Sequence, residues 1–321
     1  MKYAASWITA LGWITALAIG ASSVVSAQVP TTNEPKQPST IQPSVVVEGQ
    51  QPLYVAPNTL DRIGRIWAPV MINGKGPFRL VLDTSGNSSA IIPSVAERLG
   101  LAAEESNKAK LVGVTGSAVV SRVTVDRMTV GDVEIGGGKL PVLPDVFGGA
   151  EGVLAPQAFA DKRIFIDFRN DLIRISRSDG HAAEPGSTRV RVASNRQHLL
   201  MFDIRVGGVK TKAILSTGGE RSIGNSALRE ALLKRAREGK EEDIVGVTLD
   251  VEKGRSIAVP PVIIGDLALR NLHITFADPA IFNQWKLTRE PALIIGMDVI
   301  GSLDTLVVDY KMQELQLRPR R

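Results

Sequence analysis

The chain has 321 residues, 44% of them hydrophobic and only 5% aromatic, and its formal net charge is +5. It is long enough for two domains with a packed core, and its many Val, Ile and Gly residues suit a strand-rich protein. The absence of cysteine excludes disulfides, and the basic residues are dispersed among acids, so the charge does not predict nucleic-acid binding.

The N-terminus resembles an export signal. Lys2 is followed by a long apolar stretch that ends in Val25-Ser26-Ala27, the small-residue pattern of a signal-peptidase site. We therefore expect a signal peptide at 1–27 and a periplasmic or secreted mature protein. The alternative is an uncleaved membrane anchor, because this stretch approaches the roughly 20 residues that span a bilayer. Residues 28–60, rich in Pro, Ser, Thr and Gln, predict a flexible tether.

The remaining chain predicts a mostly β protein, because short Val, Ile and Leu runs bounded by Gly or Asp recur along it. Residues 61–178 contain strands, a polar loop, a short helix, a Gly-containing hairpin, an apolar-Gly segment and a closing hairpin, in that order. After a linker at 179–196, rich in turn-forming residues, the same order recurs in 197–321. We expect two tandem lobes with a short helix in each.

One segment of this plan carries an aspartate in the first lobe and none in the second. "FRLVLDTSGNSSAIIP" continues an apolar strand into Asp83, whereas "KTKAILSTGGERSIGN" has Ser216 at the matching position. Each strand ends in a polar residue and a small-residue turn, so we expect both loops to lie at a cleft. A hydrolase that activates water between two carboxylates needs one to accept a proton while the other holds one. This site lacks half of such a dyad.

The pattern resembles the retropepsin-like and pepsin-like aspartic proteases, in the exported bacterial form with two fused lobes. The matching features are the apolar strand before Asp83-Thr84-Ser85-Gly86, the helix "PSVAERLGL", the hairpin with Gly113 and Gly116, and the late segments "GVLAPQAF" and "IIGMDVIG". Asp-Thr-Gly alone is a weak signal, but its setting within four duplicated segments in fixed order is specific. The resemblance covers Asp61 to Pro319 and implies an acid-protease barrel in each lobe.

The resemblance also implies roles for single residues. Asp83 is the candidate catalytic aspartate, Ser216 marks the position of the missing second one, and Thr84 and Thr217 would brace the facing loops. The remaining site residues are the supporting Ser85, Gly86 and Gly218, and the substrate flap of Gly113, Val114, Thr115 and Gly116.

Two departures from the family pattern affect this site. Ser85 replaces a glycine, although Gly86 follows and could take up a strained conformation. A neutral hydroxyl at Ser216 cannot share a proton with Asp83. As a nucleophile Ser216 would need a base and an oxyanion hole, and no His or Lys stands at a telling position. Three other acids could replace the missing aspartate, namely Glu220, Asp298 and Asp304. Such residues also commonly cap turns.

Two functions follow from these residues. The first is an aspartic-type endopeptidase that hydrolyses peptide bonds with Asp83. The alternative is an inactive pseudo-protease that binds an extended peptide in the inter-lobe cleft. We expect a peptide or protein substrate, no nucleic acid, no cofactor and no metal. We also expect a monomer, with a dimer as the alternative, and membrane contact only through an uncleaved signal. The histidines, which show no metal-ligand spacing, are His181, His198 and His273.

Overall fold

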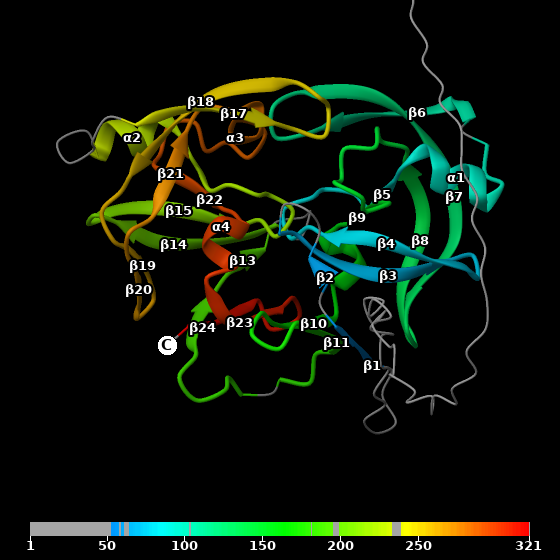
Figure 1. Ribbon diagram of the computed structural model, residues 1–321, viewed down its shortest axis with the longest axis horizontal. Helices are drawn as coiled ribbons and strands as arrows, with labels where there is room; N and C mark the ends of the chain where they lie inside the picture. Colours follow the sequence, from blue (N-terminus) through cyan, green and yellow to red (C-terminus); the bar gives the residue numbers. More distant parts are fainter. Residues whose placement is uncertain are drawn as a thin grey trace, which may run out of the picture. The chain divides into compact units, whose positions relative to one another are not determined.

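The computed structural model describes residues 53–57, 59–60, 64–102, 104–180, 182–194, 199–232 and 239–320 (Figure 1). The predicted signal peptide lies outside these residues, as does most of the predicted tether. The end of the tether range differs from the expectation, because it forms strands β1 (Leu53–Pro57) and β2 (Thr59–Leu60). Both strands pair with the folded part, so ordered structure begins before the expected start at Asp61. No helix in the described residues is long and apolar enough to cross a membrane.

An eight-stranded sheet forms the N-terminal lobe. Besides β2, its strands are β3 (Ile66–Ile72), β4 (Lys75–Leu82), β5 (Ala90–Ile91), β6 (Glu104–Val112), β7 (Ser117–Val130), β8 (Val133–Pro141) and β9 (Gly152–Leu154). The order is β5-β9-β4-β3-β7-β6, with β2 on β3 and β8 on β7. β9 runs parallel to β4 and antiparallel to β5. β4 ends in three consecutive buried residues, as expected for a strand covered on both faces.

The predicted helix of this lobe is α1 (Pro93–Leu99), and its boundaries follow from local chemistry. Pro93 occupies the first turn, where its missing N–H costs nothing. Gly100 ends the helix at φ 75°, a left-handed conformation that glycine adopts without strain. Val95, Ala96 and Leu99 face the core. A 3₁₀ turn, η1 (Pro156–Phe159), follows β9.

A ten-stranded sheet forms the C-terminal lobe. Its strands are β13 (Ala193–Ser194), β14 (Leu200–Val206), β15 (Val209–Leu215), β16 (Ile223–Gly224), β17 (Lys240–Val245), β18 (Val251–Ala258), β19 (Val262–Ile264), β20 (Leu267–Leu269), β21 (His273–Phe276) and β22 (Ala292–Ile295). The order is β17-β18-β21-β16-β22-β15-β14-β19-β20, with β13 on β14. β22 runs parallel to β15 and antiparallel to β16, which repeats the pairing of β9 with β4 and β5.

Three short helices accompany this sheet: α2 (Ser226–Leu232), α3 (Ala280–Gln284) and α4 (Met297–Ile300). The expected second helix is α2, whose first turn is capped by Asn225, since Asn225 Oδ1 accepts the Leu228 N–H at 2.9 Å. Leu228 and Leu232 are buried. The continuation of the expected helix, 233–238, lies outside the described residues.

A six-stranded sheet joins the two lobes. Besides β1, it contains β10 (Lys162–Asp167), β11 (Leu172–Arg177), β12 (Thr188–Arg191), β23 (Leu303–Asp309) and β24 (Glu314–Pro319), in the order β1-β11-β10-β23-β24-β12. The closing hairpins of the two lobes meet in the β10–β23 pair. β12 lies within the expected linker 179–196, which therefore is partly strand. Its alternation of buried Thr188 and Val190 with exposed arginines explains why it pairs with β24.

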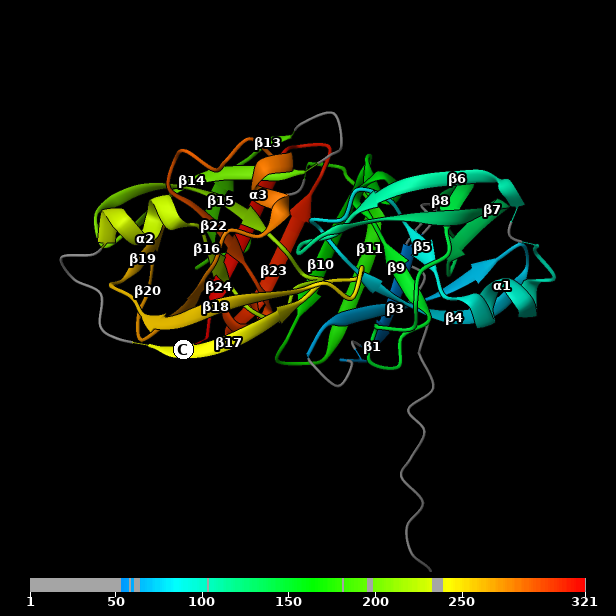
Figure 2. The ribbon, with the colours of Figure 1, turned by 90° about the horizontal axis from the view of Figure 1, so that it is seen from above.

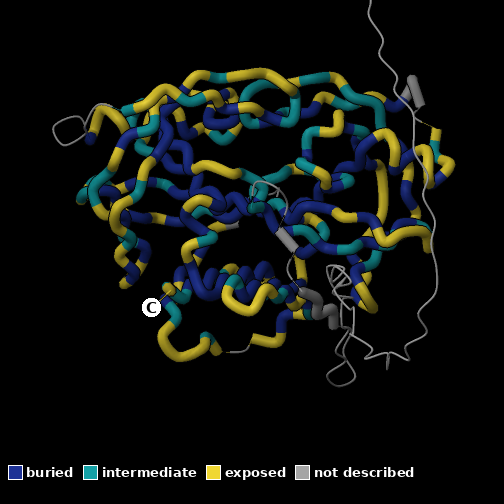
Figure 3. The backbone as a smooth tube through the Cα atoms, viewed as in Figure 1, coloured by how far each residue is buried: buried dark blue, intermediate teal, exposed yellow. Residues whose placement is uncertain are grey.

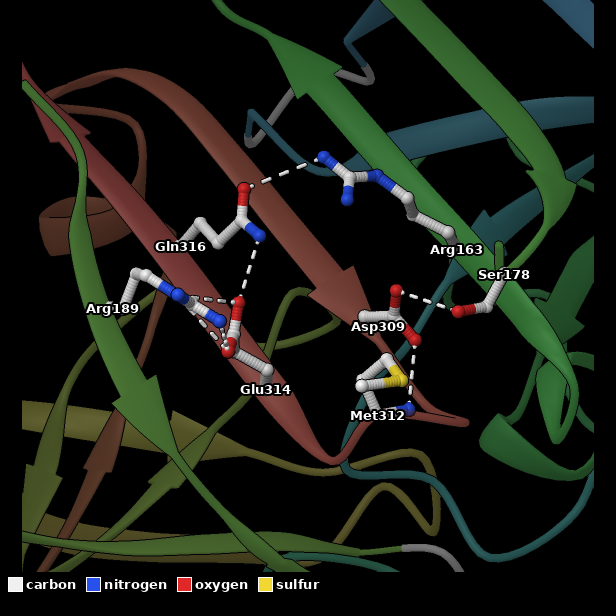
Figure 4. A network of polar contacts seen from close by, with 7 residues as sticks. All are labelled: Arg163, Ser178, Arg189, Asp309, Met312, Glu314 and Gln316. Atoms are coloured by element: carbon white, nitrogen blue, oxygen red, sulfur yellow. Dashed lines mark hydrogen bonds and ion pairs between the residues drawn. The ribbon is translucent and has the colours of Figure 1, made fainter. Parts of the chain in front are cut away.

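Polar side chains also connect the strands of this sheet (Figure 4). Arg163 on β10 donates to Gln316 Oε1 on β24 at 3.4 Å, and Gln316 Nε2 donates to Glu314 at 2.8 Å. Glu314 also pairs with Arg189 on β12. The N-terminal closing hairpin is thereby linked to both β24 and β12. The buried segments in Figure 3 run through both lobe sheets and the joining sheet. Most of their hydrophobic residues form one core that includes all three sheets, and a second, smaller cluster lies mainly in the C-terminal lobe.

Candidate functional site

Asp83 and Ser216 occupy equivalent positions, each directly after a buried strand. The Asp83 N–H donates to the Leu154 carbonyl at 2.9 Å, and the Ser216 N–H donates to the Ile295 carbonyl, also at 2.9 Å. Both carbonyls belong to the last residue of the parallel neighbour strand, β9 or β22. The two loops therefore start from the same local architecture.

Thr84 and Thr217 hold the two loops together through four reciprocal hydrogen bonds. Thr84 Oγ1 donates to the Leu215 carbonyl at 2.6 Å and accepts the Thr217 N–H at 3.2 Å. Thr217 Oγ1 donates to the Leu82 carbonyl at 2.6 Å and accepts the Thr84 N–H at 3.1 Å. Both threonines are buried. This is the bracing arrangement that the sequence predicted for the pair, and it brings Asp83 and Ser216 to one site.

Ser85 links Asp83 to Ser216 by a chain of hydrogen bonds. The Ser85 N–H and hydroxyl both donate to Asp83 Oδ1, each at 2.8 Å. Ser85 Oγ also lies 2.8 Å from Ser216 Oγ. Because a serine has one hydroxyl proton, and that of Ser85 points to Asp83, the Ser216 hydroxyl donates to Ser85. Ser216 Oγ in turn accepts the Gly219 N–H at 3.1 Å.

Two glycines allow the loops to approach the Asp83 carboxyl closely. A Cβ on Gly218 would lie 2.4 Å from Asp83 Cγ, a distance that no side chain tolerates. A Cβ on Gly86 would lie 3.2 Å from Asp83 Oδ2. The backbone at Gly218, from the C-terminal lobe, therefore packs directly on the Asp83 carboxyl.

Two of the three other candidate acids lie away from the cleft. Asp298 accepts the Ser222 N–H at 2.9 Å and the Ser222 hydroxyl at 2.7 Å at the start of α4. Asp304 is buried and lies 3.8 Å from Arg320. Neither lines the cleft, whereas Glu220 does, although it lies 3.5 Å from Arg221. In the described part of the chain, no second carboxylate is hydrogen-bonded to Asp83 or Ser216.

Tyr310 lies behind the site and was not predicted by any sequence pattern. It is buried, stacks on Phe159 with ring centroids 6.4 Å apart, and its hydroxyl has no hydrogen-bond partner within the described residues. Burial, and then the negative charge of Asp83, raise the pKa of Tyr310. Its hydroxyl therefore stays neutral and does not supply a charge to the site.

A pocket of about 390 Å³ opens in front of Asp83 and Ser216 and takes residues from both lobes. Its wall on the N-terminal lobe is mainly apolar and includes Leu111, Leu143, Val146, Phe147 and Val153. Its wall on the C-terminal lobe combines apolar, aromatic and polar residues, namely Ile223, Glu242, Ile244, Thr275, Ile281 and Trp285. An apolar cleft with a few polar groups is typical of a binding site.

Two hairpins, one from each lobe, meet over this pocket. The predicted flap is the turn of β6–β7, in which the Gly113 N–H donates to the Gly116 carbonyl at 2.8 Å. Hairpin β17–β18 approaches it from the other lobe (Figure 2). Thr115 Oγ1 donates to the Asp250 carbonyl at 2.7 Å, which joins the two tips. The flap also reaches α3, since the Ile281 N–H donates to the Val114 carbonyl at 3.2 Å.

The repeat predicts the hairpin β17–β18, but its role as a second flap was not predicted, although the sequence contains a signal for it. Val112-Gly113-Val114-Thr115 recurs as Val245-Gly246-Val247-Thr248 at the tip of β17–β18. Both glycines lie at the contact, because a Cβ on Gly246 would lie 2.4 Å from Thr115 Oγ1 and one on Gly113 would lie 3.1 Å from Val247. The repeated tetrapeptide thus marks the two flap tips that meet over the pocket.

Among the described residues, no group of three or more His, Cys, Asp or Glu side chains is placed so that it could bind a metal ion. Of the three histidines, His273 is exposed, and His181 and His198 lie outside the described residues.

Comparison with known proteins agrees with this geometry. No curated protein matches the chain. Residues 68–162 match the aspartyl protease family model, and this segment contains Asp83, the flap and β9. A domain of this family suggests aspartic-type peptidase activity. Together with the β-barrel-like lobes, the match shows that residues 68–162 are similar to retropepsin-like aspartyl protease domains.

Proposed function

We propose that this protein binds an extended peptide in the cleft between its lobes and hydrolyses it slowly or not at all. The observation that carries the proposal is the position of Ser85, whose hydroxyl lies 2.8 Å from both Asp83 Oδ1 and Ser216 Oγ. That hydroxyl bridges the two positions at which a dyad would hold its water. The protein is then a pseudo-protease of its family.

The chemistry of the site supports weak hydrolysis. Attack by water between two carboxylates needs one carboxylate to accept the water proton and the other to donate. Asp83 can act as a base, but Ser216 is a neutral hydroxyl that is not a general acid at neutral pH. A positioned acid or base contributes roughly a hundredfold to ten-thousandfold to rate, so loss of the acid alone predicts a large deficit. A water would also have to displace the Ser85 hydroxyl.

The cleft retains what peptide binding needs. Among the strands that the structure describes, β6 and β17 each pair with one neighbour only, so both are edge strands of their sheets. Both line the pocket, through Leu111 and Val112 on β6 and through Glu242 to Val245 on β17. Edge strands present unpaired N–H and C=O groups to which an extended peptide can add. The two flaps would cover the bound peptide.

We also propose the wider context that the sequence indicates. The equivalent strand pairings of the two lobes support a tandem duplication in which the second copy has lost its aspartate. Residues 1–27 would direct the chain to the periplasm or the outside of the cell and be removed. The mature protein would act as a monomer, since one chain supplies both loops of the site.

A second candidate function is a working aspartic-type endopeptidase. The intact Thr84–Thr217 network favours it, because this network still positions Asp83 rigidly. In this version Asp83 activates water alone, and the proton for the leaving amine comes from an unidentified group.

One experiment separates the two functions. The mature chain and its Asp83→Asn variant are incubated with a peptide library at acid and neutral pH. Binding is followed by fluorescence anisotropy, and cleavage by mass spectrometry. We expect saturable binding to both proteins, with negligible cleavage by either. Cleavage that Asp83→Asn abolishes would establish the endopeptidase, and absence of binding by either protein would refute the proposed function.

A further inference from the structure

We propose that Glu242 makes the C-terminal-lobe side of the cleft selective for a Lys or Arg side chain of the bound peptide. This inference rests on the proposed function, because it names which peptides the cleft prefers. It concerns a carboxylate that the family resemblance does not assign to any role.

Glu242 points into the cleft from the edge strand β17. It shares a strand face with Ile244, two residues further on, and both residues line the pocket. The side chain is half-buried. The Thr275 hydroxyl donates to Glu242 Oε2 at 2.9 Å, and Thr275 is itself buried. The carboxylate is therefore held in one place at the pocket, and its second oxygen accepts no hydrogen bond from the described residues.

The neighbours of Glu242 suit a long basic side chain. Ile223, Ile244 and Ile281 line the pocket beside it and offer an apolar surface to the methylene groups of Lys or Arg. Trp285 also lines this side and is half-buried. An indole attracts an ammonium or guanidinium group over its face. A methylene stem and a cationic end would thus both be recognised.

Glu242 differs from the neighbouring carboxylates of the cleft in its lack of a cationic partner within the described residues. The other carboxylates on this side are paired, since Glu220 lies 3.5 Å from Arg221 and Asp243 lies 4.0 Å from Lys253. In contrast, no ion pair to Glu242 forms within the described residues. A partly desolvated carboxylate gains more from a cation than an exposed one does.

The adjacent Glu241 provides a matched control. It belongs to the same strand, but its side chain is exposed on the opposite face and lies 3.7 Å from Arg255. Glu241→Gln removes the same charge as Glu242→Gln, one residue away, without touching the cleft. If the preference for basic peptides arises from the general charge of this strand, both variants should weaken it. If it arises from a specific contact with Glu242, only Glu242→Gln should weaken it.

The test uses the mature chain and peptides that differ at one scanned position, which carries Lys, Arg, Gln or norleucine. Dissociation constants are measured for the wild type, Glu242→Gln and Glu241→Gln. We expect the wild type to prefer Lys or Arg over norleucine by about 10- to 100-fold at one position, as for a hydrogen bond to a charged group. Glu242→Gln should lose this preference while binding the norleucine peptide normally. Glu241→Gln should keep it.

A charge reversal guards against a variant that merely fails to fold. Glu242→Lys should transfer the preference from basic to acidic peptides, which damaged folding would not do. If peptides bind but no position favours Lys or Arg, or if the preference survives Glu242→Gln, the inference is wrong and the proposed function stands. If neither basic nor norleucine peptides bind to the wild type, both are wrong.

Discussion

The Thr84–Thr217 network should contribute a large share of the stability of the joined lobes, and Thr217→Val tests this. Valine keeps the shape of threonine but removes its hydroxyl. The change deletes the hydrogen bond to the Leu82 carbonyl and the one from the Thr84 N–H. Both orphaned groups stay buried, and each costs about 1–3 kcal/mol. The expected loss of unfolding free energy is therefore about 2–6 kcal/mol.

The matched control is Thr211→Val, on the same strand β15 as the residues that lead to the loop. Thr211 is as buried as Thr217, but among the described residues its hydroxyl makes only a local hydrogen bond, to the Val209 carbonyl at 3.1 Å. Its loss should cost about 0.5–1.5 kcal/mol.

Thermal unfolding followed by circular dichroism measures both variants. A domain of this size loses about 2–4 °C of Tm per kcal/mol, so Thr217→Val should lower Tm by about 5–20 °C. Thr217→Val should also weaken peptide binding at temperatures where the variant and the wild type are both folded, because the two loops are no longer held together. A decrease in Tm no larger than that of Thr211→Val would refute the reasoning.

Three further predictions concern the flaps, a surface ion pair and the buried tyrosine. Thr115→Val removes the hydrogen bond to the Asp250 carbonyl and should raise the peptide dissociation rate about 2- to 10-fold in stopped-flow measurements. An unchanged rate would contradict the idea that the two flaps close over the peptide together. A hydrogen bond from Lys212 lowers the pKa of Asp203. This pairing therefore stabilises the folded protein at pH values above the ordinary pKa of an aspartate, and the stabilisation is lost as the pH falls through the lowered pKa of Asp203. Asp203→Asn should thus lower Tm at neutral pH but not in strong acid, and a pH-independent difference would argue against this pairing. Tyr310→Phe removes a buried hydroxyl that has no partner within the described residues and should leave Tm unchanged or raise it, whereas a clear decrease in Tm would contradict this expectation.

The sequence predicted those parts of the fold that local patterns determine. The strands, the two short helices and the matched loops at 83 and 216 follow from apolar runs, turn residues and a repeated segment. Thr84 and Thr217 could be paired because the resemblance assigned them one role. Their reciprocal hydrogen bonds then confirmed the expected contact between the loops.

The features that were missed depend on contacts between distant segments. The sequence predicts a linker where β12 forms, because a four-residue alternation is too short to indicate a strand without its partner β24. Glu242 lies in a run of charged residues in the sequence, and only its pairing in β17 places it at the cleft. The bridging role of Ser85 needs distances between loops that are 131 residues apart. The second flap, in contrast, could have been found from the repeated Val-Gly-Val-Thr.

The most direct test of the account is to rebuild the dyad. Ser216→Asp alone is insufficient, because Ser85 Oγ already lies 2.8 Å from Ser216 Oγ and would occupy the space of the larger side chain. In the double variant Ser85→Gly with Ser216→Asp, the new carboxylate can accept the Gly219 N–H that Ser216 now accepts. Two carboxylates would then share one proton.

Cleavage of one tightly bound peptide is measured for the wild type, Ser85→Gly, the double variant, and the double variant that also carries Asp83→Asn. The account predicts negligible cleavage by the wild type and by Ser85→Gly, a gain of about a hundredfold or more in the double variant, and loss of that gain with Asp83→Asn. Robust cleavage by the wild type, or a gain in the double variant that survives Asp83→Asn, would contradict it.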